Sequence, residues 1–588
     1  MATANDEIRA PGQTSPSGIA SASRITAVAS CAILLAGLTT IASCAYMMVA
    51  TYSPLPFWDG WIQVMYSAEG GNPLTLDWIW SQYNEHRMPI PKLFLLADLH
   101  WFHATQVFLL CSIFAILLLQ LLVFAWMLRA LGGWRGSLWR TGVGLSAFCL
   151  FCLSQWENLT WGMQVCFVLP GLFASLAFIG LLQYWTTNWQ SPQSRHWGYL
   201  LLSIAGALCA SWCYANGNLL WPILVVAALF LRLDLPAVLT YVVAGTLSTT
   251  LYLYGYIRPA SNTSIGSMPA NAKYLAAYFG SSWVGTSQHY RLAEGIGLIG
   301  FGLAFFFVLG LRSYLGDRRV LSIQLILLML FCLASGAVTT LGRSQLGVPQ
   351  AFSSRYQTVA LFFWCCLGLL VLDSLSRLKF SGNRALLIAQ AALLVIMIVG
   401  ASDVGTPLIR ARIRGFRLNA GAMSLATDIT DRDQVHWVYW GSRALNRANQ
   451  YIREKGLSIY HEPIAGLLGQ PLESSVKLAS PDRCSGGVES TTRMSASEYP
   501  SLRITGWAWD NKLQKPPAAI IAATQGTITG LGAVGDFRPM QKASRPWMAA
   551  NYLGYTAYVQ NVGRPNPIEI YAILKGRPTT ACLVGSQK

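Results

Sequence analysis

The acidic side chains of the first 402 residues are concentrated in one short stretch. These residues contain twelve Asp and Glu, and five of the twelve lie between positions 51 and 106: Asp59, Glu69, Asp77, Glu85 and Asp98. Carboxylates can accept protons or bind cations. They are costly in an apolar chain unless a functional site uses them. We therefore expect residues 51–106 to hold the functional centre.

Asp59 lies among aromatic residues in the sequence FWDGW (57–61). It closely follows the first apolar run, so it should sit just above a bilayer surface. Trp residues at that level are typical of a membrane-interface belt. Aromatic rings also stack on sugar faces, so Trp58 and Trp61 would equally suit a glycan pocket. Both interpretations stay open for the tryptophans, whereas a functional role is favoured for Asp59.

Residues 74–102 show apolar residues at helical spacing, which predicts one or two helices along the membrane surface. Asp77 lies near the start of this segment. Four consecutive polar residues of different chemistry follow: Asn84, Glu85, His86 and Arg87. They form either a solvated polar face or the edge of a substrate-binding site, and so dense a cluster in so apolar a chain favours the second.

Two further polar groups are expected on the same side of the membrane. Glu157 lies in a very short turn, and Arg343 and Arg355 bracket another connection. An Arg at the end of a span commonly reaches lipid phosphate. It could instead bind the phosphate of a lipid-linked substrate, because a guanidinium suits bidentate contact. Arg258, Lys273 and Arg291 are weaker candidates of this kind.

The elements that must position these residues are membrane helices. The chain has 588 residues, of which 53% are hydrophobic and 11% charged, whereas soluble domains are about a quarter charged. Eleven apolar runs suit spans of about 20 residues. They lie at about 26–50, 107–128, 141–155, 164–184, 198–214, 218–231, 236–255, 294–311, 321–341, 355–375 and 385–402. The pair at 198–231 is broken at Asn216-Gly217-Asn218 by a turn or a kink.

The charges of the short connections predict the orientation. Arg and Lys gather in alternate loops, which places those loops and the N-terminus in the cytoplasm. We therefore expect a multi-pass membrane protein. Residues 1–23 form a disordered cytoplasmic lead, residues 24–402 the membrane domain, and the tail is periplasmic. The net charge of +17 includes no dense basic run, so no nucleic-acid partner is expected.

The tail has an almost soluble composition and two parts. Residues 403–475 read as a helical region, in which 431–455 fits one helix ended by Gly456. Residues 476–588 show short β-like runs, which predict a small β-sandwich. Cys484 and Cys582 are the only tail cysteines, and in an oxidising compartment we expect them to pair. The predicted fold is thus mainly α in the membrane, with an α+β tail.

Four blocks resemble the C-type membrane glycosyltransferases. They are FWDGW (57–61), NEHRMPIPKLFLLADL (84–99), QWENLTWGMQ (155–164) and SSRYQTVALFFW (353–364). The large first external loop and the soluble tail also resemble that superfamily, in a bacterial branch often left unnamed. Resemblance of fold alone does not establish function.

The resemblance implies transfer of a sugar from a polyprenyl-phosphate donor to a glycan or lipid-linked acceptor. Asp59 matches the general base by position. Some members hold a divalent metal with paired acids, whereas Gly60 and Trp61 follow Asp59 here. No cofactor is certain, and a divalent metal is possible. Asp77, Glu85 and Glu157 are the other catalytic candidates: each could supply a second metal ligand or be the base in place of Asp59. The substrate-binding candidates are Trp58, Trp61, Asn84, His86, Arg87, Arg343 and Arg355.

Two other functions remain as alternatives. A transporter or flippase of lipid-linked glycans would carry ionisable groups near the bilayer midplane. A non-catalytic envelope assembly protein would use its β-domain. The sequence shows no P-loop, dinucleotide fingerprint or HExxH motif, so ATP- or NAD-driven chemistry has no support. The sugar, the acceptor and the oligomeric state are not specified by these patterns.

Overall fold

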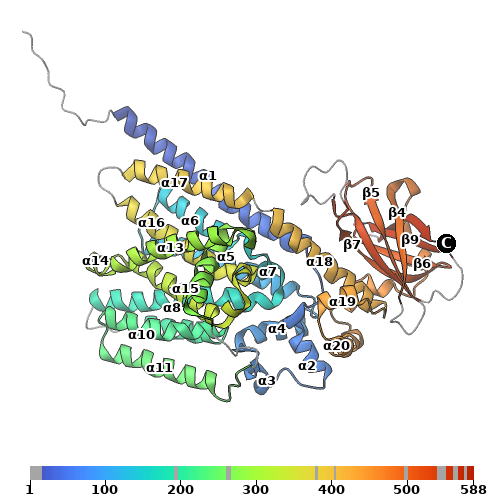
Figure 1. The fold of residues 1–588 in the computed structure, drawn as a ribbon, viewed down its shortest axis with the longest axis horizontal. Coiled ribbons are helices and arrows are strands. Elements are labelled where there is room, and N and C mark those ends of the chain that lie inside the picture. Colours follow the sequence, from blue (N-terminus) through green and yellow to red (C-terminus); the bar gives the residue numbers. More distant parts are fainter. Residues whose placement is uncertain are drawn as a thin grey trace, which may run out of the picture.

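The computed structural model describes residues 16–190, 196–259, 266–377, 382–402, 405–494, 501–538, 551–560, 567–574 and 579–587. A body of helices occupies one side of the molecule, and a β-sheet forms the C-terminal side (Figure 1). Helices α18 (Gly405–Ala426), α19 (Arg432–Val438) and α20 (Ser442–Glu454) lie between the two. The helical body and the tail are therefore joined by helices rather than by a free linker.

Within the described ranges, nine helical segments are long and apolar enough to cross a membrane. A helix rises about 1.5 Å per residue, so some 20 residues cover the apolar core of a bilayer. The segments contain α1 (Pro16–Ala50), α5 (Val107–Ala130), α6 (Gly136–Leu150), α8 (Val165–Gln190), α11 (Leu235–Leu253), α13 (Tyr290–Leu309), α15 (Val320–Arg343), α16 (Gln357–Ser376) and α17 (Gly382–Ser402). The multi-pass membrane character predicted from the sequence is confirmed.

The two remaining predicted spans are shorter helices. Helices α9 (Trp197–Ser211) and α10 (Leu220–Phe230) are apolar but have 15 and 11 residues. A 3-10 turn, η4 (Ala215–Leu219), lies between them and contains the polar break seen in the sequence. A Cβ on Gly217 would lie 1.9 Å from the Ala210 carbonyl oxygen, so this close approach requires glycine.

The first long connection folds into short helices and one hairpin. It contains η1 (Trp58–Trp61), α2 (Ile62–Ala68), α3 (Leu76–Trp80), β1 (Gln82–Tyr83), β2 (His86–Arg87) and α4 (Pro89–Trp101). Proline occupies the first turn of α4, where a missing N–H costs no hydrogen bond. The polar sequence 84–87 forms the turn and second strand of the hairpin, and Asn84 takes a left-handed φ of 47°.

Arg87 fixes this hairpin to the membrane helices. Its guanidinium donates to the backbone oxygens of Trp80, Tyr252 and Tyr254, the last two at the C-terminal end of α11. The free carbonyls of a helix end favour a cation. Arg87 was expected to bind substrate, but the structure places it as a buried anchor of the hairpin.

The tail ends in one eight-stranded sheet, ordered β3-β10-β9-β6-β7-β8-β5-β4. Neighbouring strands are antiparallel except for β3 and β10. Its strands are β3 (Lys477–Leu478), β4 (Cys484–Met494), β5 (Ser501–Asp510), β6 (Ala519–Thr524), β7 (Thr527–Asp536), β8 (Gly554–Val559), β9 (Ile568–Leu574) and β10 (Thr580–Gln587). The end of the tail is rich in β-strands, as the sequence predicted.

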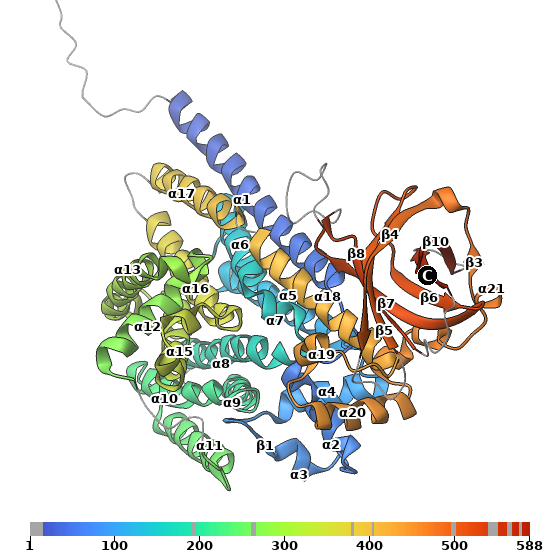
Figure 2. The same cartoon turned by 45° about the vertical axis from the view of Figure 1, so that its right-hand side comes forward.

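The sheet is rolled rather than split into the two layers of the predicted sandwich (Figure 2). The disulfide Cys484–Cys582 joins β4 to β10, as predicted. The Thr491 hydroxyl also donates to Gln587 Oε1 across the same seam. Continuous strand twist lets a single sheet close on itself in this way. One face encloses a core of Ile504, Ile520 and similar residues.

The other face of the sheet shares a second core with the tail helices and the first long connection. This core contains Leu55, Trp61 and Val64 together with Val438 and Tyr558. Trp61 has no exposed surface. The structure therefore places this predicted sugar-stacking residue in a core that forms only when the tail docks.

Candidate functional site

Six of the predicted site residues line one cavity of about 710 Å³, here called the polar cavity. They come from three distant segments and are Asp59, Asn84, Glu85, His86, Arg343 and Arg355. The rest of the lining comes from the hairpin and its flank (83–88), from the segments at 163–167, 214–216 and 256–258, and from the end of α15 with the connection that follows it (338–356). All of these segments belong to connections that the sequence places on the outer side. The fold thus gathers these connections around one cavity.

Asp59 is held by a residue that the sequence analysis did not single out. The Tyr83 hydroxyl donates a hydrogen bond of 2.7 Å to Asp59 Oδ1. Burial, and then the charge and hydrogen bond of Asp59, raise the pKa of Tyr83 well above its usual value, so the phenol keeps its proton. Among the described residues, no other donor reaches the Asp59 carboxylate. One carboxylate oxygen is thus oriented and the other is available for a substrate proton.

Glu85 and Arg343 form an ion pair across the cavity. Arg343 Nη2 lies 2.8 Å from Glu85 Oε1, although the two residues are 258 positions apart. The His86 ring stacks on Tyr214 at 3.8 Å between centroids. Burial lowers the pKa of His86 to about 4. The charge of Glu85 raises this pKa, and the charge of Arg343 lowers it. His86 is therefore neutral near pH 7 and cannot itself provide a positive charge for an anion.

Arg355 is the cavity cation with open donors. Its Nε donates to the Ser353 hydroxyl at 3.2 Å, and no carboxylate pairs with its guanidinium in the part of the chain that the structure describes. The guanidinium carbon of Arg355 lies over the Tyr356 ring, 6.0 Å from the ring centroid. A half-buried guanidinium with unpaired N–H groups is a suitable partner for a phosphate. Arg258 also lines the cavity.

Glu157 does not line the cavity but holds the turn that carries Arg355. Its Oε2 accepts the Ser354 hydroxyl at 2.6 Å and the Arg355 backbone N–H at 3.3 Å. Asn158 Nδ2 donates to the Arg355 carbonyl at 2.8 Å. The sequence blocks at 155–164 and 353–364 are therefore in direct contact. Glu157 acts on the site through the position of Arg355.

Two further predicted residues lie outside the cavity. Asp77 is exposed in the first turn of α3. Trp58 is 42% exposed and precedes Asp59 on the outer surface. No group of three His, Cys, Asp or Glu suited to a metal ion occurs among the residues that the structure describes. The charged groups that line the polar cavity are the carboxylates of Asp59 and Glu85 and the guanidiniums of Arg258, Arg343 and Arg355.

The cavity residues that the sequence analysis missed include Tyr83, Tyr214, Asn216 and Tyr256. Asn216 belongs to the polar break in the apolar run 198–231. The polar residues of this break could have indicated a functional site as well as a turn. Tyr83 directly precedes the polar cluster at 84–87. A phenol gives no sequence pattern that separates a hydrogen-bond donor to Asp59 from an interfacial aromatic residue.

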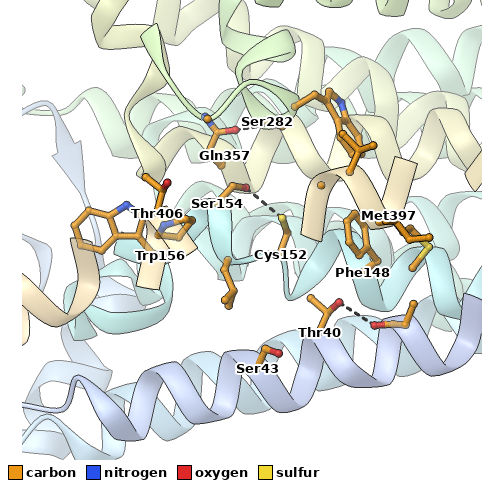
Figure 3. Close-up of a pocket in the computed structure, with 18 of the residues that line it drawn as sticks. Thr40, Ser43, Phe148, Cys152, Ser154, Trp156, Ser282, Gln357, Met397 and Thr406 are labelled. Atoms are coloured by element: carbon orange, nitrogen blue, oxygen red, sulfur yellow. Dashed lines mark hydrogen bonds between the residues drawn. The ribbon is translucent and has the colours of Figure 1, made fainter. Parts of the chain in front are cut away.

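A second cavity of about 520 Å³, here called the apolar cavity, lies among α1, α6 and α17. Figure 3 shows Thr40 and Ser43 of α1 along one side, opposite Ser154 and Gln357. The Ser282 hydroxyl donates to Gln357 Oε1 at 2.6 Å at this polar end. The remaining lining is largely aliphatic and aromatic. Ser354 lines the apolar cavity and Arg355 the polar one, so one turn separates them.

Comparison with protein-family models gave no match to this chain, and comparisons with curated proteins and with solved structures gave none either.

Proposed function

We propose that the protein is a membrane glycosyltransferase. It moves a sugar from a polyprenyl-phosphate donor to an envelope glycan or lipid-linked acceptor. The observation that carries the proposal is the polar cavity, whose lining contains both a carboxylate with an open oxygen and a guanidinium with open donors. Base and phosphate-binding cation are the two groups that such a transfer needs.

The reaction requires one proton transfer and one leaving group. The oxygen of an acceptor hydroxyl attacks the anomeric carbon of the donor sugar, and the bond from that carbon to the phosphate oxygen breaks. The electron pair of this bond stays with the phosphate. Asp59 takes the hydroxyl proton as general base, and Tyr83 keeps its carboxylate oriented. A phosphate leaves without being protonated, so a second carboxylic acid is not required.

Arg355 would stabilise the charge on the departing phosphate. Fixed donors that face a developing charge lower the barrier because they need no rearrangement during the reaction. Arg343 already forms an ion pair with Glu85. It would have to break this pair before it could bind the phosphate. The apolar cavity is separated from Arg355 by one turn, and its lining suits a segment of the polyprenyl chain.

The proposal includes a location. With the N-terminus in the cytoplasm of a bacterial cell, the polar cavity and the tail face the periplasm, where lipid-linked sugars are used to build the envelope. The alternating charge of the connections supports this orientation. Cys484 and Cys582, which form the disulfide, also suit an oxidising compartment.

The direct test is donor consumption by purified protein in detergent. We expect release of polyprenyl phosphate in equal amount to glycosylated acceptor, from a panel of donors with different sugars. Movement of the intact lipid-linked sugar across a vesicle membrane, with no new glycosidic bond, would overturn the proposal in favour of a transporter. Neither turnover nor transport, with the donor unbound, would favour an assembly role.

A further inference from the structure

A third cavity, of about 970 Å³ and here called the distal cavity, is lined by the end of α8, the connection between α10 and α11, and the short helix α14 (Leu311–Gly316). Helix α8 contributes to two cavities, because Phe167 near its start lines the polar cavity and Asn188 near its end lines the distal one. These positions are some 20 residues apart, which is about 30 Å along a helix and matches the apolar thickness of a bilayer. In Figure 1, α14 lies on the side of the helical body away from the sheet. The distal cavity is therefore at the membrane surface opposite to the polar cavity.

Two arginines from distant parts of the chain line the distal cavity. They are Arg232, which follows α10, and Arg312, in the first turn of α14. Both are exposed, and in the part of the chain that the structure describes neither guanidinium has a hydrogen bond or an ion pair. A guanidinium presents its N–H donors as a fork that fits the oxygens of a phosphate. The lining thus offers two sets of unpaired phosphate donors.

The backbone at Arg232 is unusual for an arginine. Helix α10 ends in a turn closed by two hydrogen bonds, from Arg232 N–H to the Leu229 carbonyl at 3.0 Å and from Leu233 N–H to the Ala228 carbonyl at 2.9 Å. Arg232 has a left-handed φ of 54°, a conformation in which helix ends usually place glycine. This conformation is unfavourable for other residues, and such backbone strain is found mostly at functional sites. The chain thus keeps a guanidinium where glycine would close the same turn without strain.

The remaining lining indicates the charge and the kind of molecule that fit. Among the described residues of the lining, Asp234 carries the one carboxylate, which accepts the Tyr184 hydroxyl at 3.0 Å. Two guanidiniums and one carboxylate leave a single net positive charge, which matches one phosphodiester. Leu229 and Phe230 of the lining are exposed apolar residues at the end of α10. Cations beside an exposed apolar surface suit a molecule with a phosphate and acyl chains.

Asn188 provides an acceptor in the same lining. Its Oδ1 is buried and has no hydrogen-bond partner among the described residues. A buried amide oxygen without a partner is unfavourable, and most such groups in proteins are satisfied. A hydroxyl of a bound headgroup would satisfy this oxygen by donating to it.

We propose that the distal cavity binds the headgroup of an anionic phospholipid, a phosphodiester whose alcohol carries free hydroxyls, as in phosphatidylglycerol. Arg232 and Arg312 bind the phosphate oxygens, Asn188 accepts a headgroup hydroxyl, and the acyl chains lie along Leu229 and Phe230. The loop charges predict that this surface is cytoplasmic, and the cytoplasmic leaflet is rich in anionic lipids. The inference does not depend on the proposed function, because it concerns the other membrane surface.

The test is lipid binding by the purified full chain in a neutral detergent, with a fluorescent phosphatidylglycerol as the probe. We expect Arg232→Gln and Arg312→Gln each to raise the Kd about tenfold, because each removes charge-assisted hydrogen bonds to the phosphate. Arg129→Gln is the matched control, since Arg129 is an exposed arginine in the last turn of α5 and does not line the distal cavity. Its Kd should equal that of the wild type. Equal Kd values for all four proteins, or the same loss in Arg129→Gln, would overturn the proposal.

Competition by unlabelled compounds tests the chemistry of the ligand. Phosphatidylmethanol has the same charge as phosphatidylglycerol but no headgroup hydroxyl. We expect it to displace the probe less well than phosphatidylglycerol from the wild type, and equally well from Asn188→Ala. Equal displacement by the two lipids from the wild type would contradict the role of Asn188.

Two further competitors distinguish the source of the phosphate. Glycerol 1-phosphate carries the phosphate without acyl chains, and phosphatidylcholine carries acyl chains without a net charge. We expect both to displace the probe only weakly. Displacement by glycerol 1-phosphate as effective as that by phosphatidylglycerol would assign the cavity to a soluble phosphate compound and overturn the lipid. Equally effective displacement by phosphatidylcholine would show that the acyl chains alone are bound and would overturn the anionic site.

Discussion

At Asp59, the Tyr83 phenol occupies one carboxylate oxygen and keeps its own proton. At Arg355, the single side-chain bond to Ser353 leaves the outer guanidinium nitrogens without a carboxylate partner among the described residues. These two side chains line the same cavity. Single substitutions there should therefore separate proton transfer from phosphate binding.

Arg355→Ala should raise the KM for the donor about thirtyfold, because a charge-assisted hydrogen bond is worth about 2 kcal/mol. Glu157→Ala should have a smaller effect of the same kind, since Glu157 holds the turn through the Arg355 N–H and Ser354. The double variant should resemble Arg355→Ala, as expected when one residue acts through the other. Steady-state kinetics with varied donor measures this.

Lys273→Ala is the control for the comparison of the Arg355 and Glu157 variants. Lys273 is an exposed cation of α12 (Met268–Gly280) and does not line the polar cavity. Its donor KM should equal that of the wild type. Fully additive effects of the Glu157 and Arg355 substitutions would contradict the positioning role of Glu157.

Helix α4 connects the site to the tail at its C-terminal end. Asp98 is buried there, and its Oδ2 accepts the backbone N–H and the side-chain Nε2 of Gln106, each at 3.3 Å. The next residues take positive φ at His103, Ala104 and Gln106. The His103 ring stacks on His461 of the tail at 3.9 Å. The conformation of this turn therefore depends on Asp98.

Burial raises the pKa of Asp98 from its usual 3.8 to about 7. The folded protein then keeps a proton that the unfolded chain has lost, so stability is greatest below about pH 4 and falls as the pH rises toward 7. The loss is at most about 4 kcal/mol. Asp98→Asn keeps an acceptor for Gln106 and should remove this pH dependence, as measured by thermal unfolding at several pH values. The same slope in Asp98→Asn and wild type would contradict this assignment.

Across the described part of the molecule, the sequence predicted the nine long apolar helices because an apolar window is a local signal. It predicted the disulfide because the tail has only two cysteines. It could not predict the rolled sheet, since strand pairing between β4 and β10 joins residues about a hundred positions apart. Trp61 and Arg87 were predicted to bind substrate because their burial partners could not be seen in the sequence. The tail that buries Trp61 and the α11 carbonyls that bind Arg87 are remote in the sequence.

The disulfide should stabilise the rolled sheet. It closes a loop of 98 residues between the two strands at the seam, and such a link constrains the unfolded chain. Replacing both Cys484 and Cys582 by Ala should lower the free energy of unfolding of the tail by about 2–4 kcal/mol. Thermal unfolding with and without a reductant measures the change. A reductant that leaves the wild-type unfolding temperature unaltered would count against this role.

The central claim is that Asp59 is the base of a sugar transfer in the polar cavity. The most direct measurement compares transfer by wild type, Asp59→Asn and Asp77→Asn, with donor binding measured on the same samples. Asp77 is an exposed acid of the same connection, so its variant controls for loss of charge. We expect Asp59→Asn to bind the donor as the wild type does and to lose transfer by at least about a hundredfold, with Asp77→Asn unchanged. Equal transfer by all three proteins would contradict the account.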